Sequence, residues 1–405
     1  MIAFVLPILF FSITTFTSNV TTLFRSGVIA ALALLILIVK PFDLRKYSKF
    51  ILIFVLILVG YFVSFLVNDQ SYANFLLGAY GRNFGFITLI GLFLLFLEAA
   101  EYFPKNKEKL LKSVYVLLLL ANFYGIVQNI GLDPLNWEKG AGYGLTIGNP
   151  NFSSALFGML SFLPIYYFLG SKGISRFAHS LVFISTIIQI FLSGSSQGFL
   201  LFLLNIGFHF SFFYRRSILK NIKKILYLLV LLITGLVISV LINFQSLLSL
   251  ANSTVQFNSR IEHWKLGLNI FQDNWAFGVG IDSLSRFSGE YRNLTIRNWG
   301  QYTLPDRSHN VFIDFFATGG LLVGLSWIFF VILISRYAII LCIRHPEDRK
   351  LSPAISLSFV WILYITQTLL SPDNLVLAAT GFICAGAIMG AYLNTKNSIE
   401  IVGKA

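Results

Sequence analysis

The sequence predicts an all-α, polytopic membrane protein, and both its composition and its apolar runs indicate this class. Of the 405 residues, 56% are hydrophobic and only 12% are charged, whereas a soluble domain carries about 25% charged residues. Apolar runs recur from one end of the chain to the other, and they are long enough to cross a hydrocarbon layer of about 30 Å. A transmembrane β-barrel would instead alternate in polarity over segments of about 10 residues.

We expect about 12 transmembrane helices in a single integral membrane domain that covers residues 1–405. The first apolar run lacks a basic start and a small-residue cleavage site, so it is interpreted as a span and not as a signal peptide. The run at 311–341 is too long for one straight crossing, and it is expected to tilt or to break near Gly319 and Gly320. The runs lie at 2–17, 26–40, 50–67, 83–98, 111–130, 152–169, 177–193, 198–214, 225–243, 311–341, 354–370 and 375–393.

Lysine and arginine alternate between the two sides of this predicted arrangement. Because cytoplasmic loops are enriched in these residues, we expect both termini to lie in the cytoplasm. The net charge of +13 therefore indicates orientation and not binding to nucleic acid. The basic connections are 40–49, 105–112, 170–176, 215–224 and 344–350, whereas 68–82, 131–150, 194–197 and 371–374 carry only Arg82 and Lys139.

One long extracytoplasmic loop is predicted at about 244–310, between the ninth and tenth spans. It holds five arginines and one lysine, while the rest of the chain has nine arginines and fifteen lysines. The guanidinium group binds phosphate or carboxylate through two parallel hydrogen bonds and keeps its charge when it is desolvated. The simpler interpretation is a solvated loop whose arginines pair with its own acidic residues, and such exposed pairs contribute little.

His309 is the first candidate catalytic residue, because a charged cluster precedes it and a long apolar run follows it. Asp306 and Ser308 are expected as N-caps, which would place His309 and Asn310 in the first turn of the next helix. Helix N-termini attract anions, and an imidazole can exchange a proton near neutral pH. A histidine with only a structural role at the end of a span is the alternative.

The stretch 259–271 predicts an amphipathic helix within the loop. Its apolar stripe is formed by residues at helical spacing, and such a helix could lie at the membrane interface. Arg260 and His263 fall off this stripe, and His263 is interpreted as part of a packing helix. The stripe consists of Ile261, Trp264, Leu268 and Phe271.

Three further polar clusters fall on the predicted outer face. Asn149 and Asn151 lie in a glycine-rich turn, where their amides could hold sugar hydroxyls or merely cap a helix. Gln197 lies in a short serine-rich hairpin, and Arg82 lies where a span begins. Arg82 could equally be a snorkelling anchor.

The sequence holds no Cys/His ligand set, no nucleotide-phosphate loop and no paired catalytic carboxylates, and its two cysteines imply neither a disulfide nor a metal site. We therefore expect no cofactor and no metal. A cationic, proton-handling cluster on the outer face suits a lipid-linked diphosphate that approaches from the membrane plane.

The arrangement of these motifs resembles the O-antigen ligase and polymerase family of membrane glycosyltransferases. The shared pattern is a long outer loop with an Arg-x-x-x-Trp pair, then a Gly-x-Gly element, then His-Asn opening a span that contains glycines. The Gly-Asn-Pro-Asn and Tyr-Gly-Arg stretches at 148–151 and 80–82 are similar as well, so the resemblance covers about residues 78–330. The residues that carry the pattern are Arg260, Trp264, Gly278, Gly280, His309, Asn310, Gly319, Gly320 and Gly324.

The resemblance implies transfer of a glycan from an undecaprenyl-diphosphate carrier, on the extracytoplasmic face, to a glycan or lipid A-core acceptor, without a nucleotide sugar or a metal. Arg260 would bind the diphosphate, and His309 would activate the acceptor hydroxyl or steady the leaving diphosphate. Ligases of this family usually have an arginine in the short hairpin, where this chain has Ser196 and Gln197, and this departure favours a polymerase. The expected substrate-binding residues are Arg82, Gln197, Asn149, Asn151 and Asn310.

Two other classes of function remain open at this stage. A transporter or flippase for an anion or a lipid-linked glycan would place charged residues at the middle of the bilayer, and Asp314 is the nearest candidate. A scaffold that works with other polysaccharide assembly proteins would leave Arg260 and His309 unexplained.

Overall fold

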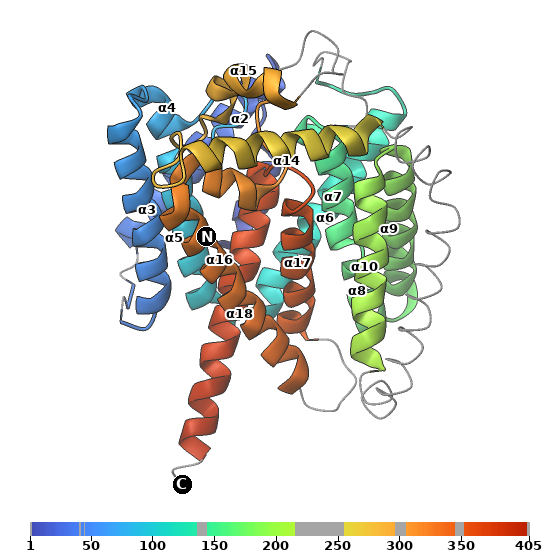
Figure 1. The fold of residues 1–405 in the computed structure, drawn as a ribbon. Helices are drawn as coiled ribbons and strands as arrows, with labels where there is room; N and C mark the ends of the chain where they lie inside the picture. Colours follow the sequence, from blue (N-terminus) through green and yellow to red (C-terminus); the bar gives the residue numbers. More distant parts are fainter. Residues whose placement is uncertain are drawn as a thin grey trace, which may run out of the picture.

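The computed structural model describes residues 2–39, 42–43, 45–135, 144–214, 255–295, 305–344 and 352–402. Most helices stand side by side as a bundle, and helix α14 lies across one end of it (Figure 1). We call this end the α14 end. The helices are α1 (Ile2–Phe11), α2 (Ser18–Val39), α3 (Ser48–Val67), α4 (Tyr72–Leu77), α5 (Phe86–Tyr102), α6 (Lys107–Asn129), α7 (Pro150–Leu160), α8 (Leu163–Gly170), α9 (Gly173–Leu192), α10 (Ser196–Phe213), α14 (Val255–Asp273), α15 (Leu284–Thr295), α16 (Val311–Arg344), α17 (Pro353–Thr368) and α18 (Leu375–Val402).

The all-α, polytopic class is confirmed. Within the described residues, nine helical segments are long and apolar enough to cross a membrane, and α1 and α17 are shorter apolar helices. The predicted span at 225–243 lies outside the described residues, so the number of twelve spans and the full extent of the long loop stay predictions. Helix α18 is central, because 94% of its apolar window is buried.

The first helix is shorter than expected. The predicted span at 2–17 ends at Phe11, where the buried Arg25 side chain donates hydrogen bonds to the carbonyls of Leu9 (2.8 Å) and Phe10 (3.1 Å). The last carbonyls of a helix lack partners within it and carry partial negative charge. A cation at this point therefore ends α1 without leaving those carbonyls unsatisfied in the apolar interior.

Helix α16 is broken at Gly320, as its length predicted. Gly320 has a φ of +72°, a conformation that a side chain disfavours. A break releases backbone groups that the hydrocarbon layer cannot satisfy. The segment that follows α14 satisfies them: Val279 and Gly280 donate to the carbonyls of Ala317 (3.0 Å) and Thr318 (2.9 Å).

Helix α16 also donates a hydrogen bond to the segment that follows α14. The backbone N–H of Leu321 donates to the carbonyl of Trp275 at 2.8 Å. The side-chain amide of Asn68, at the end of α3, donates to the Gly278 carbonyl at 2.8 Å. The Gly-x-Gly element of the predicted loop is thus bonded to the broken helix. This contact fixes the position of the residues that precede α16.

Helix α14 contains the predicted stretch 259–271, but it buries a different face from the predicted one. Leu266 and Ile270 are fully buried, whereas Leu268 of the predicted stripe is 51% exposed. His263 belongs to the buried face, at helical spacing from Leu266 and Ile270. This face packs on α16 and on the segment before it. A helix that packs on protein in this way can bury polar side chains that a lipid-facing helix would not.

Candidate active site

A polar pocket of about 290 Å³ lies where the connections between helices meet. Five stretches of chain contribute to it: the start of α2, and the connections before α5, α7, α16 and α18. The predicted residues Arg82 and Asn149 both line this pocket. The complete lining is Ser18, Asn19, Thr22, Tyr80, Gly81, Arg82, Ile147, Gly148, Asn149, Phe152, Asp306 and Asn374.

His309 stacks on His263 with ring centroids 4.3 Å apart and an angle of 13° between the rings. The two histidines come from different elements, since His263 lies on α14 and His309 lies just before α16. We call them the histidine pair. The sequence predicted only a packing role for His263, whereas the structure places it in contact with the candidate catalytic residue.

The backbone at His309 differs from the expected one. His309 lies before α16 rather than in its first turn, and its φ is +55°. The N-cap is Asn310, whose Oδ1 accepts hydrogen bonds from the backbone N–H groups of Phe312 (3.0 Å) and Ile313 (3.3 Å). Asn310 therefore caps the helix in place of Asp306 and Ser308. A non-glycine residue at positive φ costs on the order of 1–3 kcal/mol, and such residues concentrate at functional sites.

Helix α14 holds His309 in position by a contact with the His309 backbone. The Trp264 indole nitrogen donates to the His309 carbonyl at 3.4 Å. A Cβ added to Gly267 would collide with Ile313 and Ser308, so the two segments approach closely at this glycine. The Arg-x-x-x-Trp and His-Asn motifs, far apart in the sequence, are therefore in contact.

The histidine pair is neutral at neutral pH. The pKa of His309 is lowered to about 3, chiefly because of burial and then because of His263, while Asp306 opposes this shift. Burial is also the main reason why the pKa of His263 is lowered. Neutral imidazole can accept a proton, so His309 is in the form that a general base requires.

Two arginines influence the charge around this pair. Arg260 and Arg82 both lower the pKa of His309. Arg260 is partly buried, and among the described residues no carboxylate forms an ion pair with it. Arg82 is already paired, because its Nε donates to Asp306 Oδ2 at 2.6 Å. This pairing holds the pKa of Asp306 below its ordinary value against the effect of burial. Arg260 is therefore better suited than Arg82 to neutralise an anion.

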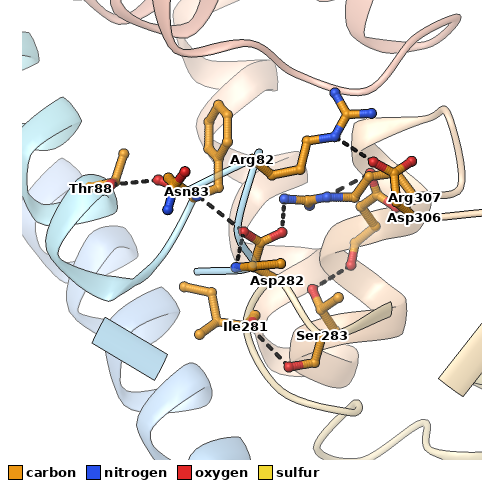
Figure 2. Close-up of polar contacts among 12 residues, drawn as sticks. Arg82, Asn83, Thr88, Ile281, Asp282, Ser283, Asp306 and Arg307 are labelled. Atoms are coloured by element: carbon orange, nitrogen blue, oxygen red, sulfur yellow. Dashed lines mark hydrogen bonds and ion pairs between the residues drawn. The ribbon is translucent and has the colours of Figure 1, made fainter. Parts of the chain in front are cut away.

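A second ionic cluster lies deeper, and Figure 2 shows it beside the Arg82–Asp306 pair. Arg307 pairs with Asp282, whose Oδ2 also accepts hydrogen bonds from the backbone N–H groups of Ala79 (2.8 Å) and Phe84 (3.1 Å). Asp314 accepts hydrogen bonds from Ser308 and lies 3.9 Å from Arg307. Burial would lower the pKa of Arg307, but these carboxylates raise it. The cluster joins three segments of chain and is not open to a large ligand.

The remaining predicted residues have protein contacts of their own. Asn149 caps α7, where its Oδ1 accepts from the Asn151 backbone N–H at 2.8 Å. Asn151 accepts a 2.7 Å hydrogen bond from Ser195, which ties α7 to the hairpin between α9 and α10. Gln197 is 2% exposed, and neither atom of its amide has a hydrogen-bond partner within the described part of the chain. Neither Asn151 nor Gln197 lines the polar pocket.

Sequence reasoning missed several residues of this region. Asn19 and Asn374 line the polar pocket from the start of α2 and the connection before α18. No motif marks them, because each is one of several polar residues in a short connection next to an apolar run. The spacing of His263 could have predicted its position, because it lies three residues before Leu266 and four before Gly267 and so shares one helix face with them. In the described ranges, no group of three or more His, Cys, Asp or Glu side chains could hold a metal ion.

Comparison with known families agrees with the motif resemblance. Residues 181–328 match the family model of O-antigen ligase. No curated protein matches the chain. The match confirms the resemblance to the O-antigen ligase and polymerase family, whose members are glycosyltransferase-like enzymes of surface polysaccharide biosynthesis, and the apolar helices agree with a multi-pass membrane protein. The matched segment contains Arg260 and the histidine pair, whereas Arg82 and Asn149 lie outside it.

Proposed function

We propose that this protein transfers a glycan from an undecaprenyl-diphosphate carrier to an acceptor hydroxyl, at the extracytoplasmic face of the bacterial inner membrane. The contact between α14, which bears Arg260, and His309 carries this proposal. It brings a neutral imidazole together with an arginine that has no carboxylate partner among the residues the structure describes. We propose that the α14 end faces the extracytoplasmic side, which agrees with the alternation of basic connections along the chain.

In the proposed reaction, an acceptor hydroxyl oxygen attacks the anomeric carbon of the donor glycan. The new carbon–oxygen bond forms as the bond from the anomeric carbon to the diphosphate oxygen breaks, and the diphosphate leaves with the bonding electron pair. The hydroxyl proton passes to the neutral imidazole of His309. General base catalysis of this kind contributes about 10²–10⁴ in rate.

The negative charge of the diphosphate links proton uptake by His309 with departure of the leaving group. The low pKa of His309 makes it a weak base in the free protein. A bound diphosphate would place negative charge near the imidazole and raise its pKa, which makes proton uptake more favourable. Arg260 would neutralise the diphosphate as it leaves, since fixed cations stabilise charge that develops in the transition state.

The acceptor decides between a polymerase and a ligase. Gln197 stands in the hairpin where ligases of the resembled family have an arginine, and a buried glutamine adds no positive charge for a diphosphate. We therefore propose a polymerase, which transfers the glycan to another carrier-linked unit. Transfer to a lipid A core is the alternative.

The experiment uses a deletion strain and the purified full chain. In the strain, a polymerase predicts loss of long glycan chains while single units are still attached. A ligase predicts carrier-linked polymer that never reaches its final acceptor. The purified protein, supplied with carrier-linked glycan, should lengthen it and release undecaprenyl diphosphate. Movement of intact carrier-linked glycan across vesicles without any transfer would support a flippase instead.

A further inference from the structure

Several polar atoms that line the polar pocket are not used in hydrogen bonds within the described part of the protein. Asn149 and Asn374 each use Oδ1 to accept a backbone N–H. Their amide nitrogens have no hydrogen-bond partner within the described residues. Asp306 uses Oδ2 for Arg82, and no hydrogen bond to its Oδ1 is made by the residues that the structure describes. The pocket thus presents two amide NH2 groups as donors and one carboxylate oxygen as an acceptor.

This combination discriminates between classes of ligand. A sugar hydroxyl both donates and accepts a hydrogen bond, so neighbouring hydroxyls can satisfy amide donors and a carboxylate together. A diphosphate only accepts hydrogen bonds, and it would meet the negative charge of Asp306. Because Arg82 and Asp306 neutralise each other, the pocket has no surplus cation to offset that repulsion.

The pocket also has a firm apolar side and a limited size. The Arg82 guanidinium lies over the Phe152 ring at 5.9 Å, so ring and cation hold each other in place. Tyr80 stands at the rim and is 63% exposed. The cavity of about 290 Å³ is just below the usual range of ligand pockets, about 300–1,000 Å³. This size suits a terminal sugar unit rather than a long glycan.

We infer that the polar pocket binds the terminal sugar of an uncharged acceptor glycan, while the diphosphate of the donor binds on the Arg260 side. This inference rests on the proposed function. Asp306 lines the pocket and lies three residues before His309, so the segment that carries the proposed base also forms one wall of the pocket. Except for Asp306, every lining residue falls outside the segment 181–328 that matches the family model. Most of the pocket is therefore built by residues outside the segment that the family model matches.

Two near-isosteric substitutions test the pocket without removing its helix caps. Asn149→Asp and Asn374→Asp keep the oxygen that accepts the backbone N–H, and they replace the amide donor with a second acceptor oxygen. Aspartate is as good an N-cap as asparagine. Asn106→Asp is the matched control, because Asn106 is the residue before α6 and lies outside the pocket.

Binding is measured with the purified full chain in lipid nanodiscs. The probe is the free oligosaccharide released by mild acid from the strain's own carrier-linked glycan, detected by saturation-transfer NMR. We expect each pocket variant to weaken binding about tenfold, which corresponds to about 1.4 kcal/mol. The Asn106→Asp protein should bind like the wild type, and inorganic diphosphate should not displace the oligosaccharide.

Three results would overturn the inference: no oligosaccharide binding by the wild type, equal binding by the wild type and both pocket variants, or displacement by inorganic diphosphate. This equilibrium measurement needs no turnover. A wild-type protein that binds the oligosaccharide but never transfers glycan would refute the proposed function and leave the pocket intact. A protein that transfers glycan with unchanged sugar binding in both variants would refute only the pocket.

Discussion

Two arginines near the α14 end, Arg307 and Arg260, differ in burial and in pairing. Arg307 lies against Asp282 and Asp314, and it is enclosed by the segments that these residues join. Arg260 is partly buried and has no carboxylate partner within the described residues. The comparison teaches that arginines of one loop can have different environments: Arg307 holds segments of the chain together, whereas Arg260 is the one we propose for binding an anion.

The largest expected effect is on the enclosed group. Arg307→Ala should destabilise the protein by about 3–5 kcal/mol, because it leaves buried carboxylates without their cation. Unfolding of the purified protein by heat or denaturant in detergent measures this loss. Arg286→Ala is the control, since Arg286 is exposed and should change stability by less than about 0.5 kcal/mol. Equal stability of both variants would remove the structural half of the comparison.

The histidine pair should give the reverse result, with activity lost and the fold retained. We expect His309→Asn and His309→Ala to lower the transfer rate by about 10²–10⁴. Asparagine adopts positive φ more readily than most residues, so it replaces the histidine with little strain but cannot act as a base. The transfer assay at matched protein levels measures the effect.

His179→Asn is the matched control for this prediction. His179 lies on α9 and bonds to the Tyr115 hydroxyl at 2.8 Å, outside the candidate site. It should leave transfer near the wild-type rate. Substantial turnover by well-folded His309→Asn protein would reduce His309 to a structural residue at the start of α16.

Arg260→Lys should have a smaller effect that appears in donor binding. Lysine keeps the charge but loses the planar fork that binds two phosphate oxygens. A hydrogen bond to a charged group contributes about 1.5–3 kcal/mol, so the KM for the carrier-linked donor should rise about tenfold or more. Arg286→Lys serves as the control. An unchanged donor KM in Arg260→Lys would mean that only bulk charge matters at this position.

The smallest effect is expected for His263→Phe, and it should depend on pH. Phenylalanine keeps a ring that can stack on His309 but removes the group that lowers the pKa of His309 electrostatically. The pKa of His309 should therefore rise, and its neutral, active form should be lost at a higher pH. We expect the acid limb of kcat/KM to move upward while the rate at neutral pH changes little. An acid limb at the same pH as in the wild type would show that His263 does not influence the pKa of His309.

Features set by local composition could be predicted from the sequence. The predicted span at 50–67 corresponds to Ser48–Val67, because a run of apolar residues both crosses a membrane and forms a helix. The break near Gly320 followed from a run too long to cross once. The resemblance singled out the Arg-x-x-x-Trp and His-Asn motifs, and the structure shows that they are in contact.

Features set by tertiary contact could not be predicted in this way. The prediction of which face of α14 is buried was wrong. Counting apolar residues favours Leu268 over His263, whereas close packing at Gly267 decides which face turns inward. The Arg82–Asp306 pair joins residues 224 positions apart, and no local pattern connects them. The positive φ of His309 likewise depends on the contacts that hold it.

The hydrogen bonds between the broken helix α16 and the segment that precedes it have a consequence for biogenesis and for protein engineering. The first half of α16 would carry unsatisfied carbonyls into lipid if Val279 and Gly280 were not already in place. The partner segment precedes α16 in the chain, so it is synthesised before α16. A chimera that exchanges the loop between two relatives must therefore carry the residues through Leu321 with it, because a junction at Asn310 would separate each donor N–H from its own acceptor.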